Sequence, residues 1–307
     1  MLPLRLRDFI EDADGWIYAV STYDNDDRIG CVLRYVPDEN GVRILPSGRR
    51  YTKYDFDEAY AHVSRYKPQY AGLLHRVPHE DVKRVLKPDL EIGRIAATHP
   101  RVARLVTIFA QPHGTVGCTG SLLCELENES SDIDMVVYGK HWFFAQALVR
   151  QGIREGTIEG LSEAMWRKVY EKRKPEIPFD SFVLHEQRKW NRGQIEGTYF
   201  DILYTRSYDE IRNAPSGRGQ VLGKQTIEAK VTDASLAFDN PAVYEVEHES
   251  VSRVLSFTHT YSGQALAGEI IEACGVLEEH GNEKWLVVGT TREARGEYII
   301  SKTLLDA

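Results

Sequence analysis

Two aspartates separated by a single residue, Asp132 and Asp134, stand at the start of the apolar segment 133–138. Successive side chains of a β-strand point to opposite faces of a sheet, so both carboxylates are expected on one face and Ile133 and Met135 on the other. Two carboxylates side by side at a hydrophobic sheet are costly unless a cation lies between them. A hard divalent cation, which prefers oxygen ligands, suits such a pair. The pattern therefore predicts a metal site.

Gly120 and Ser121 lie upstream of this pair, where an expected strand at residues 115–119 ends and a helical turn begins. Free backbone N–H groups at a helix start bind phosphate, and glycine permits a close approach of the ligand. The next apolar residues are spaced to pack inward: Leu122, Leu123 and Leu126. A phosphate cradle joined by one short loop to a paired-acid metal site predicts a site for a nucleoside triphosphate with Mg²⁺ and in-line displacement.

Each half of this pattern has a simpler interpretation when it occurs alone. A single Gly-Ser pair is usually a turn, and a single Asp-x-Asp is usually a solvated strand end or a cap. The combination in a strand–turn–helix–loop–strand context is considerably more specific than either half.

The order Gly120-Ser121, a spacer of ten residues and Asp132-Ile133-Asp134 resembles the signature of the DNA polymerase β-like nucleotidyltransferase superfamily. The resemblance implies a mixed α/β palm, a nucleoside triphosphate donor and two Mg²⁺ ions, with Mn²⁺ as an alternative metal. It also implies a third carboxylate on a neighbouring strand, for which Asp201 is the best match and Asp180 the second candidate. More loosely, the whole chain resembles a group of uncharacterised archaeal predicted nucleotidyltransferases.

The resemblance gives each residue an expected role. Asp132, Asp134 and Asp201 would be the catalytic and metal-binding residues, and Gly120 and Ser121 would bind the β- and γ-phosphates. The expected reaction moves a nucleoside monophosphate from a nucleoside triphosphate, with ATP as the preferred donor, to a hydroxyl acceptor and releases pyrophosphate. The acceptor stays open between an RNA end, a protein and a small molecule, as do base preference and oligomeric state.

Two other functions remain open. The same fold could be a catalytically silent scaffold that senses nucleotides or binds RNA, although both Asp132 and Asp134 are present. Alternatively, the C-terminal domain could bind a basic protein partner while the core is merely regulatory. The segments Arg49–Tyr54 and Arg65–Lys67 interleave basic and aromatic residues, a composition typical of single-strand nucleic-acid binding. Acidic residues interrupt the composition, which favours a solvated strand surface.

The elements that must position these residues follow from local patterns. Residues 8–70 read as short strands broken by turns, with a helix at 57–65. Residues 78–110 read as helical, in one segment that starts at Pro78 and another that starts at Pro100. Residues 141–174 are also mostly helical, and residues 199–204, which contain Asp201, form a buried-looking strand.

The last part of the chain is rich in short strands with glycine turns, which predicts a small barrel-like domain. The expected strands are 226–231, 243–246, 254–258, 268–277 and 285–288. The predicted fold class is α+β or mixed α/β, a nucleotidyltransferase palm with flanking β domains. The expected divisions are a strand-rich N-terminal lobe at 1–72, the core at 73–212, a linker at 213–223 and the C-terminal β domain at 224–307.

Charge and composition limit the function classes. From Lys224 onward there are 7 basic and 14 acidic residues, so most of the net charge of −8 belongs to the C-terminal domain. This argues against a broadly positive nucleic-acid-binding surface. Four cysteines without metal or disulfide spacing, an early Arg-Asp pair and short apolar runs predict a cytoplasmic protein with no membrane partner.

Overall fold

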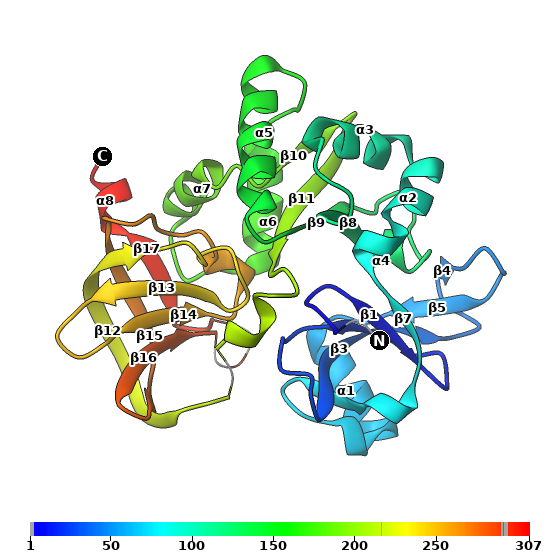
Figure 1. The fold of residues 1–307 in the computed structure, drawn as a ribbon, viewed down its shortest axis with the longest axis horizontal. Helices are drawn as coiled ribbons and strands as arrows, with labels where there is room; N and C mark the ends of the chain where they lie inside the picture. Colours follow the sequence, from blue (N-terminus) through cyan, green and yellow to red (C-terminus); the bar gives the residue numbers. More distant parts are fainter. Residues whose placement is uncertain (1–2, 216, 290, 292–293) are drawn as a thin grey trace. The chain divides into compact units, whose positions relative to one another are not determined.

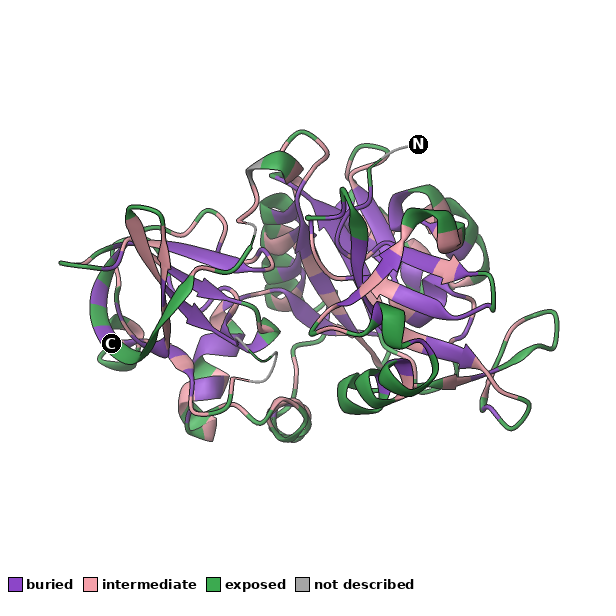
Figure 2. Ribbon diagram, turned by 90° about the horizontal axis from the view of Figure 1, so that it is seen from below, coloured by how far each residue is buried: buried purple, intermediate pink, exposed green. Residues whose placement is uncertain are grey.

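The computed structural model describes residues 3–215, 217–289, 291 and 294–307. The chain divides into two compact units (Figure 1): residues 1–159 with 192–214, and residues 160–191 with 215–307. Each unit combines helices and sheets, which confirms the expected mixed α/β class. Buried residues gather in the strands of both units, whereas the helices carry exposed outer faces (Figure 2).

The first unit begins with an antiparallel sheet of seven strands, ordered β4-β5-β3-β2-β1-β7 with β6 paired to β3. Their bounds are β1 (Phe9–Asp12), β2 (Ile17–Val20), β3 (Arg28–Pro37), β4 (Arg43–Ile44), β5 (Arg50–Lys53), β6 (His75–Pro78) and β7 (Val82–Leu86). Helix α1 (Phe56–Tyr66) packs against β3 and is followed by the 3-10 helix η1 (Pro68–Tyr70). A capping box at Asp55 and Glu58 fixes the start of α1, close to the expected position.

The expected helix after Pro78 is wrong. A single 3-10 turn, η2 (His79–Asp81), leads into strand β7, which pairs antiparallel with β1. Val82, Val85 and Leu86 have a spacing that fits either a helix or a short strand, and length alone does not separate the two. Because the edge of β1 supplies backbone hydrogen-bond partners, the segment forms a strand and not a helix.

The second sheet of this unit has the order β10-β11-β9-β8. Its strands are β8 (Val116–Thr119), β9 (Ile133–Tyr138), β10 (Arg192–Ile195) and β11 (Thr198–Thr205), and only β9 and β11 run parallel. The expected strands 115–119, 133–138 and 199–204 are thus confirmed. Helix α2 (Pro88–Thr98) packs against β8, and helix α5 (His141–Glu155) packs against β9 and β11. Helix α3 (Pro100–Phe109) contacts both helices, and α4 (Gly120–Leu123) follows β8.

The second unit is built on a ring of strand pairings. β12 pairs with β13, β13 with β14, β14 with β16, β16 with β15, and β15 again with β12, while β17 adds to β15. Their bounds are β12 (Gln220–Asp233), β13 (Ala242–Glu247), β14 (Arg253–Ser256), β15 (Ile270–His280), β16 (Glu283–Val288) and β17 (Tyr298–Ser301). The helices of this unit are α6 (Glu163–Arg173), α7 (Phe179–Arg188) and α8 (Lys302–Leu305), with the 3-10 helix η4 (His259–Tyr261).

The two units divide the chain differently from the expected domains. The N-terminal sheet continues past residue 72 because β6 and β7 belong to it. Residues 160–191 belong to the second unit because Trp166, Ile177 and Phe182 are buried in its hydrophobic core. The division at 214–215 falls within the expected linker, whose Ser216 lies outside the described residues, and the 3-10 helix η3 (Ile211–Asn213) precedes it.

All four cysteines are buried and none forms a disulfide bond, as expected. Among the described residues, no helix has both the length and the apolar character needed to cross a membrane.

Candidate active site

Asp134 occupies the middle of the second sheet. In the strand register it lies opposite Thr119 of the antiparallel neighbour β8 and opposite Asp201 of the parallel neighbour β11. Asp132 comes immediately before β9 and is exposed, whereas Asp134 is partly buried. The pairing of β9 with β11 therefore brings Asp134 and Asp201, which are far apart in sequence, to adjacent positions.

The turn after β8 places Gly120 directly against Asp134. All four residues of β8 are buried, and Gly120 then adopts a left-handed backbone with φ 70°. A β-carbon at this position would overlap the Asp134 carboxylate, so both the conformation and the close approach require glycine. The leucines predicted to pack inward are indeed buried: Leu122, Leu123 and Leu126.

Two contacts with other segments of the first unit fix the position of this turn. Gly117 lets the start of α2 approach β8, because a β-carbon there would lie 2.5 Å from the backbone of Pro88. The Thr119 hydroxyl donates a hydrogen bond of 2.7 Å to the carbonyl of Arg7, which itself has an unusual left-handed φ of 74°. A bulky residue in that conformation is strained and persists only where its surroundings fix it. The N-terminal segment is thereby tied to the residue that precedes Gly120.

Asp201 has two polar neighbours on its own side of the sheet. Its Oδ2 accepts a hydrogen bond of 2.9 Å from the Tyr199 hydroxyl, and its Oδ1 lies 3.3 Å from Nε of Arg192 on β10. The Asp201 side chain is 15% exposed, and its buried Oδ1 has no hydrogen-bond partner among the described residues. Asp201 thus keeps an oxygen available for a ligand, but an arginine also competes for it.

The electrostatic environment raises the pKa of Asp134 from 3.8 to about 6. Burial is the largest cause, and the negative charges of Asp201 and then Asp132 add to it. Arg7 and Lys53 lower the pKa by a smaller amount. Asp201 and Asp132 therefore both act electrostatically on Asp134.

A small cavity of about 100 Å³ joins the predicted residues to the N-terminal sheet. Its lining contains four of the five predicted site residues, namely Gly120, Ser121, Asp132 and Asp134. The other lining residues are Phe9, Arg34, Tyr35, Arg43, Lys53, Ser130 and Ser131. The cavity thus has an acidic wall from the second sheet and a cationic wall from the first.

The cationic wall was not predicted from the sequence. Lys53 belongs to the basic-aromatic segment Arg49–Tyr54, but Arg34 and Arg43 carry no local signal that sets them apart from other strand arginines. Tyr35 and Lys53 face each other in the register of β3 and β5, which brings both to the cavity. The grouping depends on strand pairing, which local sequence does not specify.

Two expectations about the carboxylates differ from the geometry. Asp180, the second candidate for the third carboxylate, is exposed in the first turn of α7 in the second unit, not on a buried strand. Among the described residues, no three His, Cys, Asp or Glu side chains are arranged to hold a metal ion. Asp201 and Asp132 act electrostatically on Asp134, but the three carboxylates do not form such a group.

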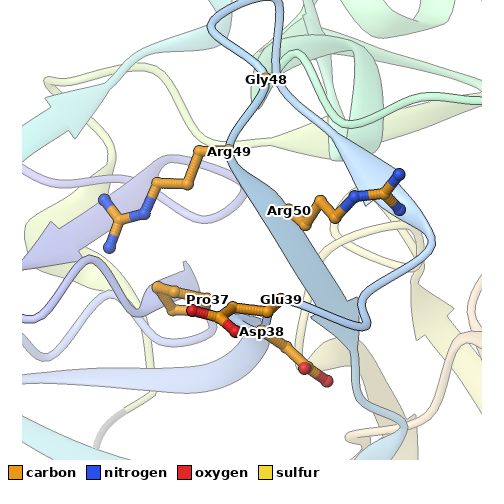
Figure 3. Close-up of a pocket in the computed structure, with 6 residues that line it drawn as sticks. All are labelled: Pro37, Asp38, Glu39, Gly48, Arg49 and Arg50. Carbon is orange, nitrogen blue, oxygen red and sulfur yellow. The ribbon is translucent and has the colours of Figure 1, made fainter.

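A larger and more open cavity of about 380 Å³ lies at the hairpins of the N-terminal sheet (Figure 3). It is lined by Pro37, Asp38, Glu39, Gly48, Arg49 and Arg50, and by none of the predicted site residues. Its polar groups serve the hairpins themselves: Asp38 accepts hydrogen bonds from Thr52 and Asn40, and Arg50 donates to the Gly41 carbonyl. The smaller cavity is therefore the better candidate for chemistry.

Comparison with known proteins places this architecture in a family. Uncharacterized protein MJ1086 of Methanocaldococcus jannaschii is 37% identical over 337 aligned positions, which cover 97% of this chain and 99% of that protein. The chain belongs to the same family. Because nearly the whole of both chains is shared, the relationship covers both compact units. No protein-family model and no solved structure matches the chain.

Proposed function

We propose that this protein is a metal-dependent nucleotidyltransferase that moves a nucleoside monophosphate from a nucleoside triphosphate to a hydroxyl acceptor. One observation carries the proposal: the register of β9 with β11 sets Asp134 beside Asp201, while Asp132, Gly120 and Ser121 share a cavity with Asp134. This arrangement contains the functional groups that such a transfer needs. Carboxylates can hold a cation, and a glycine-serine turn can accept phosphate.

The three carboxylates supply the oxygen donors that a divalent cation prefers. Burial, together with the negative charges of Asp201 and Asp132, raises the pKa of Asp134, and the buried Oδ1 of Asp201 lacks a hydrogen-bond partner among the described residues. Asp132 and Asp134 would hold one Mg²⁺, and all three aspartates would share a second; Mn²⁺ would suit the same oxygens. Bound Mg²⁺ would neutralise charge on the triphosphate and lower the pKa of the acceptor hydroxyl.

The chain's own residues would then orient the reactants. Gly120 and Ser121 would hold the β- and γ-phosphates of the donor, for which ATP is the preferred candidate. Asp201 would orient the acceptor hydroxyl and take its proton as the oxygen attacks the α-phosphorus. The new phosphorus–oxygen bond would form as the bond to pyrophosphate breaks, with the two oxygens in line. An RNA end, a protein or a small molecule could supply the hydroxyl.

A transfer assay with α-³²P-labelled nucleoside triphosphates and Mg²⁺ tests this proposal. The full chain is expected to release pyrophosphate and label one acceptor in a panel of RNA, protein and small-molecule hydroxyls. Asp134→Ala should abolish the label, whereas Asp180→Ala, which changes an exposed acid of α7, should leave it unchanged. Equal labelling by the wild type and Asp134→Ala would rule out this site as the catalytic one.

A second candidate function, a catalytically silent nucleotide-sensing or RNA-binding scaffold on the same fold, is favoured by one specific contact. Arg192 pairs with Asp201, so the third carboxylate already has a cationic partner. Calorimetry with ATP and Mg²⁺ followed by the transfer assay separates the two functions. Tight ATP binding with no pyrophosphate released from any acceptor would favour the scaffold.

A further inference from the structure

The cavity wall that faces the aspartates is supplied by the N-terminal sheet. It contains Arg34 of β3, Arg43 of β4 and Lys53 of β5. Three cations beside two carboxylates are more positive charge than Asp132 and Asp134 can neutralise. The excess cationic charge identifies this wall as a site for an anion.

Arg34 is the cation whose charge is least satisfied by the protein. It is half-buried, and its guanidinium makes no hydrogen bond or ion pair with any described residue. Its aromatic neighbour is the ring of Phe56, with 6.0 Å from the guanidinium carbon to the ring centre. A partly desolvated guanidinium that keeps all its donors available is suited to the paired oxygens of a phosphate.

The other two cations have different tasks. Arg43 donates hydrogen bonds of 3.0 Å to both the Leu126 carbonyl and the Ser131 hydroxyl, so it is occupied with the loop that leads to Asp132. Lys53 is exposed, faces Tyr35 across the β3–β5 pair, and acts electrostatically on Asp134. Lys53 is therefore an exposed cation of the cavity lining whose charge reaches Asp134.

We propose that Arg34 and Lys53 of the N-terminal sheet bind the phosphate chain of a nucleoside triphosphate. The cavity is also lined by Ser121, whose hydroxyl can donate a hydrogen bond to a phosphate oxygen. This inference rests on the proposed function and extends it, because it makes the N-terminal sheet half of the donor site.

A polyphosphate fits these observations better than the backbone of a nucleic acid. The cavity is small, about 100 Å³, and its cations lie close together on one wall. A nucleic-acid strand would instead require cations that follow the strand along a groove.

Binding of inorganic tripolyphosphate tests the proposed phosphate site of Arg34 and Lys53 without requiring nucleotide transfer. Calorimetry with the full chain and Mg²⁺ should detect its binding. Arg34→Gln and Lys53→Gln should each weaken binding by about tenfold, the loss typical of one charge-assisted hydrogen bond. Lys83→Gln is the matched control, since Lys83 is an exposed lysine of β7 that does not line the cavity. It should change the affinity by less than about twofold, as expected of a distant screened charge.

Two further measurements separate a binding role from a structural one. Thermal unfolding should give the same midpoint for all three variants and the wild type, and Arg34→Lys should recover part of the lost affinity. In the labelled-nucleotide assay, Arg34→Gln should raise KM for the nucleoside triphosphate.

The outcomes distinguish this inference from the proposed function. No tripolyphosphate binding by the wild type, or equal binding by Arg34→Gln, Lys53→Gln and the wild type, would overturn the inference even if transfer is observed. If Arg34→Gln and Lys53→Gln lose binding to a single-stranded oligonucleotide but bind tripolyphosphate as the wild type does, the inference would be overturned in favour of a nucleic-acid site. Tripolyphosphate binding that depends on both residues, without label transfer to any acceptor, would support the inference and refute the proposed activity.

Discussion

Asp134 is the residue at which the requirements of stability and of the proposed chemistry conflict. It is partly buried between Asp201 and Asp132, and its pKa is raised to about 6. A group whose folded pKa is raised binds its proton more tightly in the native state than in the unfolded chain. The contribution of Asp134 to the unfolding free energy of the metal-free protein should therefore fall as the pH rises from 3.8 to above about 6.

Asp134→Asn should remove this cost and stabilise the metal-free protein. Above about pH 7 we expect the unfolding free energy to rise by about 1–3 kcal/mol relative to the wild type, because the neutral amide buries no charge and does not repel Asp201 and Asp132. Below about pH 3 both proteins should be equally stable, because Asp134 is then protonated in both the folded and the unfolded state. Urea unfolding in the presence of a chelator, repeated over this pH range, measures the difference.

Mg²⁺ provides the control for this prediction. It should raise the melting temperature of the wild type, which can hold the ion, and have little effect on Asp134→Asn. A variant that is less stable than the wild type at neutral pH would contradict the electrostatic explanation.

Gly120 offers a second prediction, with Gly156 as a matched control. Both residues have a left-handed backbone, with φ 70° and 74°, but a β-carbon would meet the Asp134 carboxylate at Gly120 and nothing within 4 Å at Gly156. Alanine at either position should cost about 1–2 kcal/mol of unfolding free energy. Only Gly120→Ala should also lower nucleotide transfer, by more than about tenfold, because it displaces a carboxylate. Equal transfer rates for the two variants would show that this close contact does not matter.

At the scale of elements, buried charge pairs tie the N-terminal segment to the second sheet. The Arg5 guanidinium is 2.9 Å from Asp89 at the start of α2 and lies between the rings of Tyr138 and Tyr208, at 3.6 and 3.8 Å from their centres. Lys87 pairs with Asp8 at 2.7 Å in the same region. These contacts explain why the two sheets of the first unit, which carry opposite walls of the cavity, form one compact body.

Arg5→Met should destabilise the protein by about 3–5 kcal/mol, since it leaves the buried Asp89 carboxylate without its partner. The double variant Arg5→Met/Asp89→Leu should regain a large part of that loss, because no unpaired charge remains. Arg104→Met is the control: its ion pair with Glu196 has side chains that are 49% and 48% exposed. It should cost at most about 1 kcal/mol in the same urea titration. If the double variant recovers none of the lost unfolding free energy, the loss comes from the aromatic contacts of Arg5.

At the scale of the whole molecule, the chain crosses between the two units more than once. It leaves the first unit after Glu159, builds α6 and α7 in the second, returns at Arg192 and leaves again after residue 214. The strongly acidic segment from Lys224 onward lies entirely in the second unit. A cut near residue 214 therefore does not separate the units.

Truncation at residue 214 should give an aggregating protein, because Trp166, Ile177 and Phe182 lose the core in which they are buried. Replacing residues 160–191 with a Gly-Ser linker of about four residues in the same truncated chain should instead give a folded first unit. Glu159 and Gln194 form an antiparallel bridge, so the two ends to be joined are already close. Size-exclusion chromatography and thermal unfolding check both chains. Tripolyphosphate binding by the linked chain would assign the cavity to the first unit alone, and a linked chain that fails to fold would contradict this division.

Local sequence determined much of the second sheet of the first unit. Strand periodicity predicted β9 and the buried positions of Ile133 and Met135, and the spacing of the leucines after Ser121 predicted their burial. These features depend on residues close together in the sequence. Their side-chain directions follow from the periodicity of a strand or a helix. The same information placed Asp132 and Asp134 together, and both line one cavity.

Only the tertiary structure decided what stands beside these residues. The parallel pairing of β9 with β11 set Asp201 next to Asp134, and the first sheet brought Arg34 and Lys53 to the same cavity. The strand at Val82–Leu86 and the transfer of α6 and α7 to the second unit were likewise unforeseen. In each case the structure depends on a hydrogen-bonded strand or an apolar core that is distant in the chain. Local propensity is too weak to specify such a partner.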